Sequence, residues 1–123
     1  MVKLKRILIV EDFDDFRFSL RRLLEIEGYE VIEATDGMQA INIASQSLPD
    51  LILMDLSLPG LDGLETTRRL RQTEQLKVIP IIAISAHDTE DFHDDAIIAG
   101  CNAYITKPVD FDQLETAISK LLP

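Results

Sequence analysis

Five polar residues that follow short apolar segments have side chains suited to binding a metal ion and a phosphoryl group. Glu11 and Asp12 follow one apolar run, Asp55 closes another, and Ser85 and Lys107 end two more. Clustered carboxylates raise one another's pKa, and a hard divalent cation such as Mg²⁺ relieves their repulsion. A lysine ammonium and a serine hydroxyl suit phosphoryl oxygens. The carboxylate of Asp55 can then act as a nucleophile and form an aspartyl phosphate.

The apolar runs predict five β-strands that would position these residues. They are Ile7–Val10, Tyr29–Ala34, Leu51–Met54, Ile81–Ala86 and Ala103–Thr106. Four are nearly continuously apolar, which is typical of strands buried on both faces. The second contains Glu30 and Glu33, which favours an edge strand.

Amphipathic patterns between the runs predict five helices. The first has an apolar face made of Phe13, Phe16, Leu20, Leu23 and Leu24. The second, fourth and fifth have predicted N-caps at Asp36, Asp88 and Asp110, and the third follows residues 62–63. Gly28 and Gly100 fall where the first and fourth should end. This alternation indicates a parallel sheet with helices on both faces, and therefore one edge that collects the polar residues.

Length, charge and cysteine content narrow the function classes. With 123 residues and 46% hydrophobic content, we expect one domain spanning residues 1–123. A net charge of −10 argues against direct binding to nucleic acid or an anionic membrane. The single cysteine, Cys101, excludes an internal disulfide, is expected to be buried, and fits a cytoplasmic location. Neither a signal peptide nor an apolar run of transmembrane length is visible.

The motifs together resemble the receiver domain of two-component response regulators, the CheY-like family. The matching segments are Glu11-Asp12, residues 53–63 around Asp55, Ser85-Ala86, and residues 104–108. They cover essentially the whole chain in order. The resemblance implies an α/β, flavodoxin-like fold: a doubly wound five-stranded parallel sheet of order 2-1-3-4-5 with five helices on both faces.

The resemblance also implies roles for individual residues. Asp55 matches the residue that accepts a phosphoryl group. Asp12 and Asp55 match direct Mg²⁺ ligands, the backbone carbonyl of Ser57 matches a third ligand, and Glu11 matches a residue acting through water. Mg²⁺ is therefore the expected cofactor.

Three further matches concern the response to phosphorylation. Lys107 matches the lysine that contacts the phosphoryl group, and the peptide before the matching Pro108 is commonly cis in the family. Ser85 and Tyr104 match the switch pair, in which the hydroxyl moves toward the phosphoryl group and the aromatic ring turns inward. The face formed by the fourth helix, fifth strand and fifth helix would then change shape for a partner.

Four residues carry weaker hypotheses. Ser57 and His87 match positions that border the path of the hydrolytic water, so they are predicted to tune the phosphate lifetime, or else are ordinary loop residues. His93 is expected at the surface rather than as a metal ligand. Helical spacing exposes Phe18, which is either a partner contact or a lone surface aromatic.

The predicted function is a phospho-accepting switch, not a turnover enzyme, with only self-catalysed phosphorylation and dephosphorylation. Its expected partners are a sensor histidine kinase or phosphotransfer protein and a downstream protein target. The chain is expected to be a monomer or a weak phosphorylation-dependent dimer, either complete or cut from a hybrid kinase or larger regulator.

Alternative functions are a flavodoxin-like redox carrier, an aspartyl-phosphate phosphatase of the haloacid dehalogenase type, and a scaffolding pseudo-receiver. The acidic first loop disfavours the redox carrier, Ser57 stands where the phosphatase needs an acid, and the complete set of phosphorylation residues disfavours the pseudo-receiver.

Overall fold

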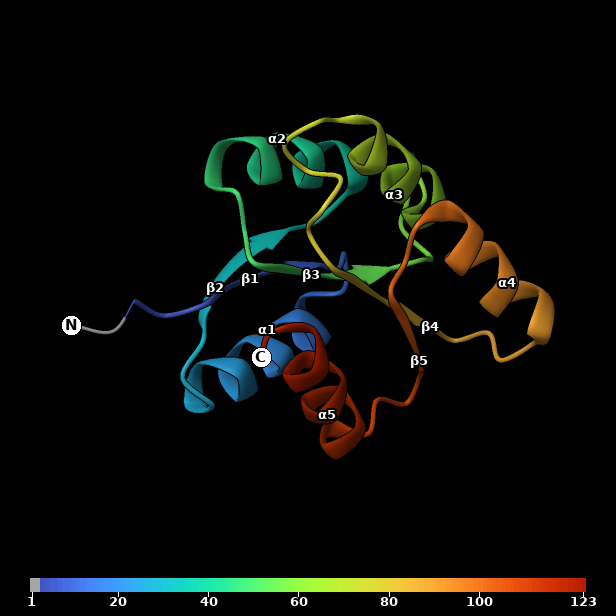
Figure 1. Ribbon diagram of the computed structural model, residues 1–123. Coiled ribbons are helices and arrows are strands. Elements are labelled where there is room, and N and C mark those ends of the chain that lie inside the picture. Colours follow the sequence, from blue (N-terminus) through green and yellow to red (C-terminus); the bar gives the residue numbers. More distant parts are fainter. Residues whose placement is uncertain (1–2) are drawn as a thin grey trace.

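Five strands and five helices alternate along the computed structural model, which describes residues 3–123 (Figure 1). The strands are β1 (Arg6–Val10), β2 (Glu30–Ala34), β3 (Leu51–Asp55), β4 (Ile81–Ser85) and β5 (Ala103–Thr106). The helices are α1 (Asp14–Ile26), α2 (Gly37–Ser47), α3 (Gly63–Gln72), α4 (Glu90–Ala99) and α5 (Phe111–Leu121). The predicted number and order of elements are confirmed.

The strands form one parallel sheet in the order β2-β1-β3-β4-β5. Helices α1 and α5 cover one face, and α2, α3 and α4 cover the other (Figure 1). The expected flavodoxin-like fold and the edge position of β2 are both confirmed. The expectation that β5 is buried on both faces is wrong, because β5 forms the other edge and only Ile105 in it is fully buried.

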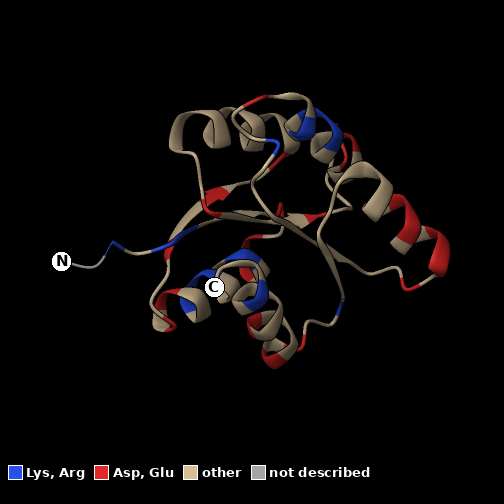
Figure 2. Cartoon of the chain, in the orientation of Figure 1, with Lys and Arg blue, Asp and Glu red and all other residues tan. Residues whose placement is uncertain are grey.

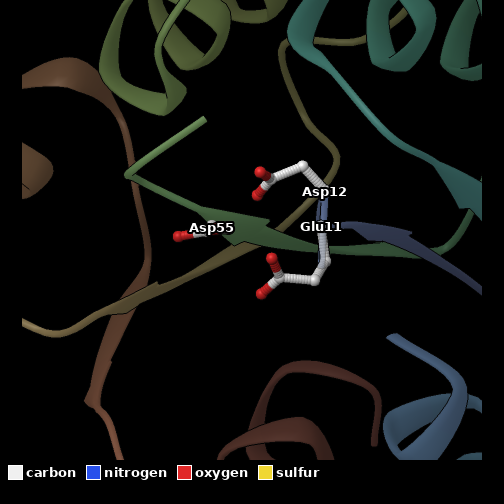
Figure 3. A group of neighbouring side chains, drawn as sticks. All are labelled: Glu11, Asp12 and Asp55. Carbon is white, nitrogen blue, oxygen red and sulfur yellow. The ribbon is translucent and has the colours of Figure 1, made fainter. Parts of the chain in front are cut away.

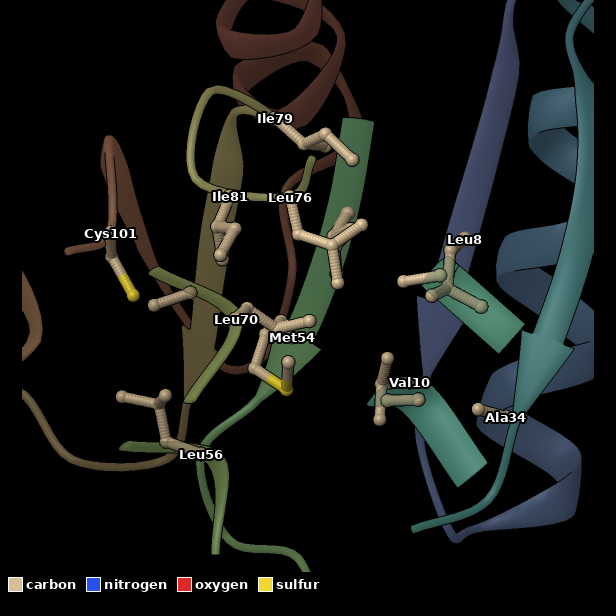
Figure 4. Close-up of a cluster of buried hydrophobic side chains, with 14 of the residues drawn as sticks. Leu8, Val10, Ala34, Met54, Leu56, Leu70, Leu76, Ile79, Ile81 and Cys101 are labelled. Carbon is tan, nitrogen blue, oxygen red and sulfur yellow. The ribbon is translucent and has the colours of Figure 1, made fainter. Parts of the chain in front are cut away.

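The core consists of two apolar layers that alternate along each strand. Leu8, Met54 and Ile81 pack toward the helices of one face, where Leu70 of α3 meets them (Figure 4). Their strand neighbours face the opposite way, toward α1 and α5; they include Ile7, Ile9, Leu51, Leu53, Ile82 and Ile84. Strands buried in this way on both faces need near-continuous apolar sequence. The sheet is thus a rigid frame that fixes where its carboxyl ends lie.

The helix caps agree with the sequence except at α4. Asp36 and Asp110 accept backbone hydrogen bonds at the starts of α2 and α5, as predicted. The N-cap of α4 is Thr89 instead of Asp88: the hydroxyl of Thr89 accepts from the amide of Phe92 at 3.4 Å. Asp88 does not cap the helix because its carboxylate contacts His93 of α4 and Thr106 of β5. Gly100, with a φ of +120°, ends α4 as predicted.

The buried face of α1 differs from the prediction at its first turn. Leu20 and Leu24 are buried as expected, but Phe13 precedes the helix and is 61% exposed. Arg17 lies on the buried face, with only 9% of its side chain exposed. Phe18 is exposed on the other side, as predicted. A guanidinium is buried only where it finds partners, and these lie at the sheet edge described below.

No helix within residues 3–123 combines the length and the apolar character needed to cross a membrane.

Candidate functional site

Three carboxylates meet at the carboxyl edge of the sheet. Glu11 and Asp12 follow β1, Asp55 ends β3, and these two strands are neighbours. Each residue offers one oxygen, and the three oxygens lie within 4.8 Å of one another (Figure 3). The convergence predicted from the sequence is therefore confirmed, and its cause is the adjacency of β1 and β3.

Asp55 is held in place by the backbone around it. It is 3% exposed, and its Oδ1 accepts a hydrogen bond of 3.0 Å from the amide of Ser57. The amide of Leu56, between these two residues, donates to the carbonyl of Ile84 in β4 at 3.0 Å. One oxygen of Asp55 is thus fixed by its own loop while the strand ladder fixes the backbone.

Lys107 follows the edge strand β5 and reaches the carboxylates at the ends of β1 and β3. Its Nζ lies 3.3 Å from Oε1 of Glu11 and 3.7 Å from Oδ1 of Asp55, and 5.0 Å from the ring centre of Phe16. Its amide donates to the carbonyl of Ser85 at 2.8 Å, which anchors the segment directly after β5. The peptide between Lys107 and Pro108 is cis, as the family pattern suggested. One ammonium therefore faces two buried carboxylates.

Burial raises the pKa of Glu11 to about 7. The nearby carboxylate of Asp55 raises it as well, whereas the amide of Phe13, 3.1 Å from Oε2, and the ammonium of Lys107 act in the opposite direction. Glu11 is only 2% exposed, so water does little to stabilise its charged form. The charged form of Glu11 is therefore disfavoured beside Asp55.

Ser85 and Tyr104 both contact one loop residue, His87. Ser85 is fully buried, and its Oγ accepts a hydrogen bond of 3.1 Å from the amide of His87. The hydroxyl of Tyr104 donates to the carbonyl of His87 at 2.7 Å. The imidazole of His87 stacks on the ring of Phe92, with ring centres 4.1 Å apart. The loop after β4 therefore connects the two predicted switch residues.

Sequence reasoning missed two residues that support the site. Arg17 donates from Nη1 to the backbone carbonyl of Glu11 at 3.0 Å and from Nε to Glu33 at 3.1 Å. Gly63, the first residue of α3, lies so close to β3 that a Cβ there would overlap the carbonyl of Asp55 and approach Cα of Leu56 to 2.6 Å. The Asp62-Gly63 pair at the start of α3 was a visible signal for the second. No pattern near Arg17 in the sequence indicated its contact with the site.

The donors fit Mg²⁺ in kind and in charge. All three side chains offer carboxylate oxygens, which hard divalent cations prefer. Asp12 is exposed, so the cluster has one carboxylate open to solvent beside two buried ones, and Mg²⁺ usually keeps several waters. His93 lies outside this cluster, in α4.

Comparisons with known proteins agree with this geometry. The family model of the response regulator receiver domain matches residues 7–119. Sporulation initiation phosphotransferase F of Bacillus subtilis is 33% identical over 119 residues, which cover 97% of this chain and 94% of that protein. The polar-differentiation response regulator DivK of Brucella anthropi is 37% identical over 118 residues, 96% of each chain.

Solved structures of receiver domains and response regulators are also similar to this chain. The receiver domain of a sensor histidine kinase from Pseudomonas aeruginosa, with a magnesium ion coordinated in its active-site cleft, has a TM-score of 0.89 and 34% identity over 97% of this chain and 98% of that one. A two-component response regulator of the LuxR family from an Aurantimonas species has a TM-score of 0.90 and 36% identity, covering 98% and 86% of the two chains.

The family match decides against two of the alternatives. A redox carrier and a dehalogenase-type phosphatase share the strand-helix alternation, but the receiver model runs from β1 into α5 of this chain. Receiver domains are signalling switches of two-component phosphorelays, not classical enzymes. They bind Mg²⁺ in an acidic pocket and interact with histidine kinases or phosphotransfer proteins and with downstream targets. This chain belongs to the family of response regulator receiver domains.

Proposed function

We propose that Asp55 accepts a phosphoryl group from a phosphohistidine of a sensor histidine kinase or phosphotransfer protein. The supporting observation is a carboxylate only 3% exposed, with a lysine ammonium 3.7 Å from its Oδ1. A carboxylate oxygen attacks phosphorus, so that a P–O bond forms while the P–N bond breaks. The bonding pair leaves with the imidazole nitrogen, and the imidazole, protonated on its other nitrogen, departs neutral.

The metal ligands we propose are the carboxylates of Asp12 and Asp55 and the backbone carbonyl of Ser57, with Glu11 acting through water. The clustering of carboxylate oxygens within 4.8 Å supports this set. When bound, Mg²⁺ would supply positive charge against the phosphoryl oxygens. Lys107 would supply further positive charge there and would exchange part of its contact with Glu11 for the phosphoryl group.

The proposed readout runs through Ser85 and Tyr104. The hydroxyl of Ser85 turns toward a phosphoryl oxygen. In doing so it loses the hydrogen bond that it accepts from the amide of His87. The ring of Tyr104 then turns toward the space near Ser85, and the face formed by α4, β5 and α5 changes for a downstream protein. Charge added at one site is thereby converted into a change of packing at another.

Hydrolysis resets the switch. Water attacks phosphorus, the bond to Asp55 breaks, and the carboxylate and inorganic phosphate separate. We propose that Ser57 and His87 tune this self-catalysed step, because both follow a site residue by two positions. Rates of phosphate loss from Ser57→Ala and His87→Ala proteins test this, and a rate equal to that of wild type removes the residue concerned from the proposal.

We further propose that residues 1–123 act as one receiver domain in the cytoplasm, as a monomer or a weak phosphorylation-dependent dimer. The continuous apolar layers on both sides of the sheet support one folding unit. The acidic surface, most concentrated on the first turns of α4, gives no support for direct contact with nucleic acid or anionic membrane (Figure 2).

The central test is incubation with acetyl phosphate and Mg²⁺, followed by intact-mass measurement. Wild type should gain the mass of one phosphoryl group, and Asp55→Asn should gain none. The matched control is Asp95→Asn at an exposed position of α4, which should behave like wild type. No addition to wild type, or equal addition to Asp55→Asn, overturns the proposal.

A further inference from the structure

Two histidines stack on aromatic rings close to the predicted switch residues Ser85 and Tyr104. His93 in α4 stacks on Tyr104 in β5, with ring centres 3.9 Å apart and ring planes 25° apart. His87 stacks on Phe92, with ring centres 4.1 Å apart and planes 6° apart. Phe92 and His93 both belong to α4, which lies beside β5 (Figure 1). The contact between His93 and Tyr104 has no part in the metal site or in the phosphoryl transfer.

Tyr104 is held at both ends of its side chain. Its hydroxyl donates to the carbonyl of His87 at 2.7 Å, and its ring face lies against the imidazole of His93. We call this arrangement the outward position of Tyr104. Turning the ring toward the buried Ser85 breaks both contacts at once. The outward position is therefore stabilised by α4 as well as by the loop after β4.

His93 is itself held in place by a third contact. Its Nε2 lies 3.2 Å from Oδ1 of Asp88, and the same oxygen accepts a hydrogen bond of 3.3 Å from the hydroxyl of Thr106. Thr106 lies two residues beyond Tyr104, so both point to the same face of β5. Asp88 thus links the imidazole to the strand that carries the tyrosine, which explains why Asp88 does not cap α4.

We propose that His93 is a positioning residue that holds Tyr104 outward and so sets how often the unphosphorylated switch visits its active arrangement. This inference rests on the proposed roles of Ser85 and Tyr104. Aromatic contacts of this kind change an equilibrium by roughly two- to tenfold. When only a fraction of molecules is competent to bind, the apparent dissociation constant rises by the inverse of that fraction. Loss of the stack should therefore make a phosphoryl analogue bind more tightly.

The first measurement observes Tyr104 directly, without a phosphoryl group. The chain has two tyrosines, so ring-labelled tyrosine gives two sets of NMR signals, and Tyr104→Phe assigns them. In His93→Ala, the Tyr104 signals should move toward the positions that they take in wild type with bound beryllofluoride. Ile98→Ala, at an α4 position 81% exposed, is the matched control and should leave them in place.

The second measurement is the apparent dissociation constant of beryllofluoride in the presence of Mg²⁺. It should fall roughly two- to tenfold in His93→Ala. His93→Phe, which retains a flat ring for the stack, should return most of the way to wild type. In a Tyr104→Ala background, His93→Ala should have no further effect, because the residue it positions is gone.

Two outcomes overturn the inference: Tyr104 signals in His93→Ala that do not move toward their positions in beryllofluoride-bound wild type, or an equal affinity change with and without Tyr104. The NMR measurement compares unliganded proteins and uses beryllofluoride only to mark the positions of the Tyr104 signals in the active arrangement. A chain that acetyl phosphate fails to phosphorylate but that binds beryllofluoride can therefore still show the stack acting on Tyr104, so the two failures are distinguishable.

Discussion

The ammonium of Lys107 lies 3.3 Å from Oε1 of Glu11, a residue 96 positions earlier in the chain and only 2% exposed. The same ammonium lies 3.7 Å from Asp55. One positive charge thus serves two buried carboxylates, and Asp12 adds a third negative group beside them. The energetics of the site should therefore depend on pH and on divalent cations.

The first prediction concerns pH and the stability of the metal-free protein. Glu11 has a pKa of about 7 in the folded protein, raised from 4.5 chiefly by burial. Between these values the folded state binds more protons at Glu11 than the unfolded state does, so the contribution of Glu11 to stability falls as pH rises from about 4.5 to about 7. The slope approaches roughly 1 kcal/mol per pH unit.

Urea unfolding in a chelator from pH 5 to pH 8 measures this slope. Glu11→Gln removes the titration and keeps an oxygen for the amide of Phe13, so it should lack the Glu11 part of the slope. Added Mg²⁺ should stabilise wild type increasingly as pH rises through about 7, because the cation competes with the proton. Identical slopes for the two proteins would contradict the prediction.

The second prediction concerns Arg17 and the metal ligands. Its guanidinium donates to the carbonyl of Glu11 and is fixed by Glu33 and by Asp14 at 2.6 Å. Lysine lacks this planar fork, so Arg17→Lys should loosen the loop that carries Glu11 and Asp12. Mg²⁺ affinity should fall by about tenfold, the lower end for residues that orient metal ligands.

Calorimetric titration with Mg²⁺ tests this, after circular dichroism has shown that the variant is folded. The control is Arg22→Lys, the same change at an exposed position of α1, which should leave the affinity unaltered. Equal Mg²⁺ affinities for Arg17→Lys and wild type would show that Arg17 stabilises the fold without positioning the ligands.

The third prediction concerns the close approach of α3 to β3 at Gly63. A Cβ there would overlap the carbonyl of Asp55, so Gly63→Ala must displace the backbone that carries Asp55. We expect a loss of about 1–3 kcal/mol in unfolding free energy, as for other overpacked sites. Mg²⁺ affinity and phosphorylation by acetyl phosphate should also fall.

Gly28→Ala separates the two effects. Gly28 has a φ of +97° and open space around it, and it precedes β2 at the opposite edge of the sheet. Its alanine variant should lose stability through backbone strain but keep the Mg²⁺ affinity of wild type. If Gly63→Ala also keeps that affinity, the contact at Gly63 does not matter to the site.

The fourth prediction concerns Arg71, which fastens the end of α4 to the loop before β4. It donates to the carbonyls of Gly100 at 3.0 Å and Ile79 at 2.6 Å, and to Oδ1 of Asn102 at 2.9 Å. Burial lowers its pKa, and these partners are neutral acceptors. Arg71→Met should leave several acceptors unpaired and lower the unfolding free energy by about 2–4 kcal/mol.

Urea unfolding of Arg71→Met beside Arg68→Met provides the comparison. Arg68 forms a surface ion pair with Glu65 in which both side chains are more than 40% exposed, so its loss should change stability by less than about 0.5 kcal/mol. Similar losses for the two variants would argue that the hydrogen bonds of Arg71 add nothing beyond its surface position.

Much of the fold and of the site was predictable because the relevant signals are local in sequence. Runs such as Ile7–Val10 and Leu51–Met54 must be apolar to be buried on both faces. Glu11-Asp12 directly follows the first and Asp55 the second. Parallel strands then bring such residues to one edge without any knowledge of side-chain packing. The number of strands, a parallel sheet with helices on both faces and the clustering of the carboxylates followed from that alone, and the flavodoxin-like strand order from the resemblance.

Other features were decided only by tertiary structure. The apolar pattern placed Phe13 on the buried face of α1, but Arg17 is buried there because Glu33 from β2 and the carbonyl of Glu11 receive its hydrogen bonds. Asp88 was the predicted N-cap of α4, yet contacts with α4 and β5 occupy its carboxylate.

The pairing of Lys107 with Glu11 and the stacking of His93 on Tyr104 are of the same kind. Periodicity and capping preferences describe a residue and its near neighbours. These contacts join segments that meet only after the sheet has assembled, and which side chain takes which partner depends on burial and geometry at that point.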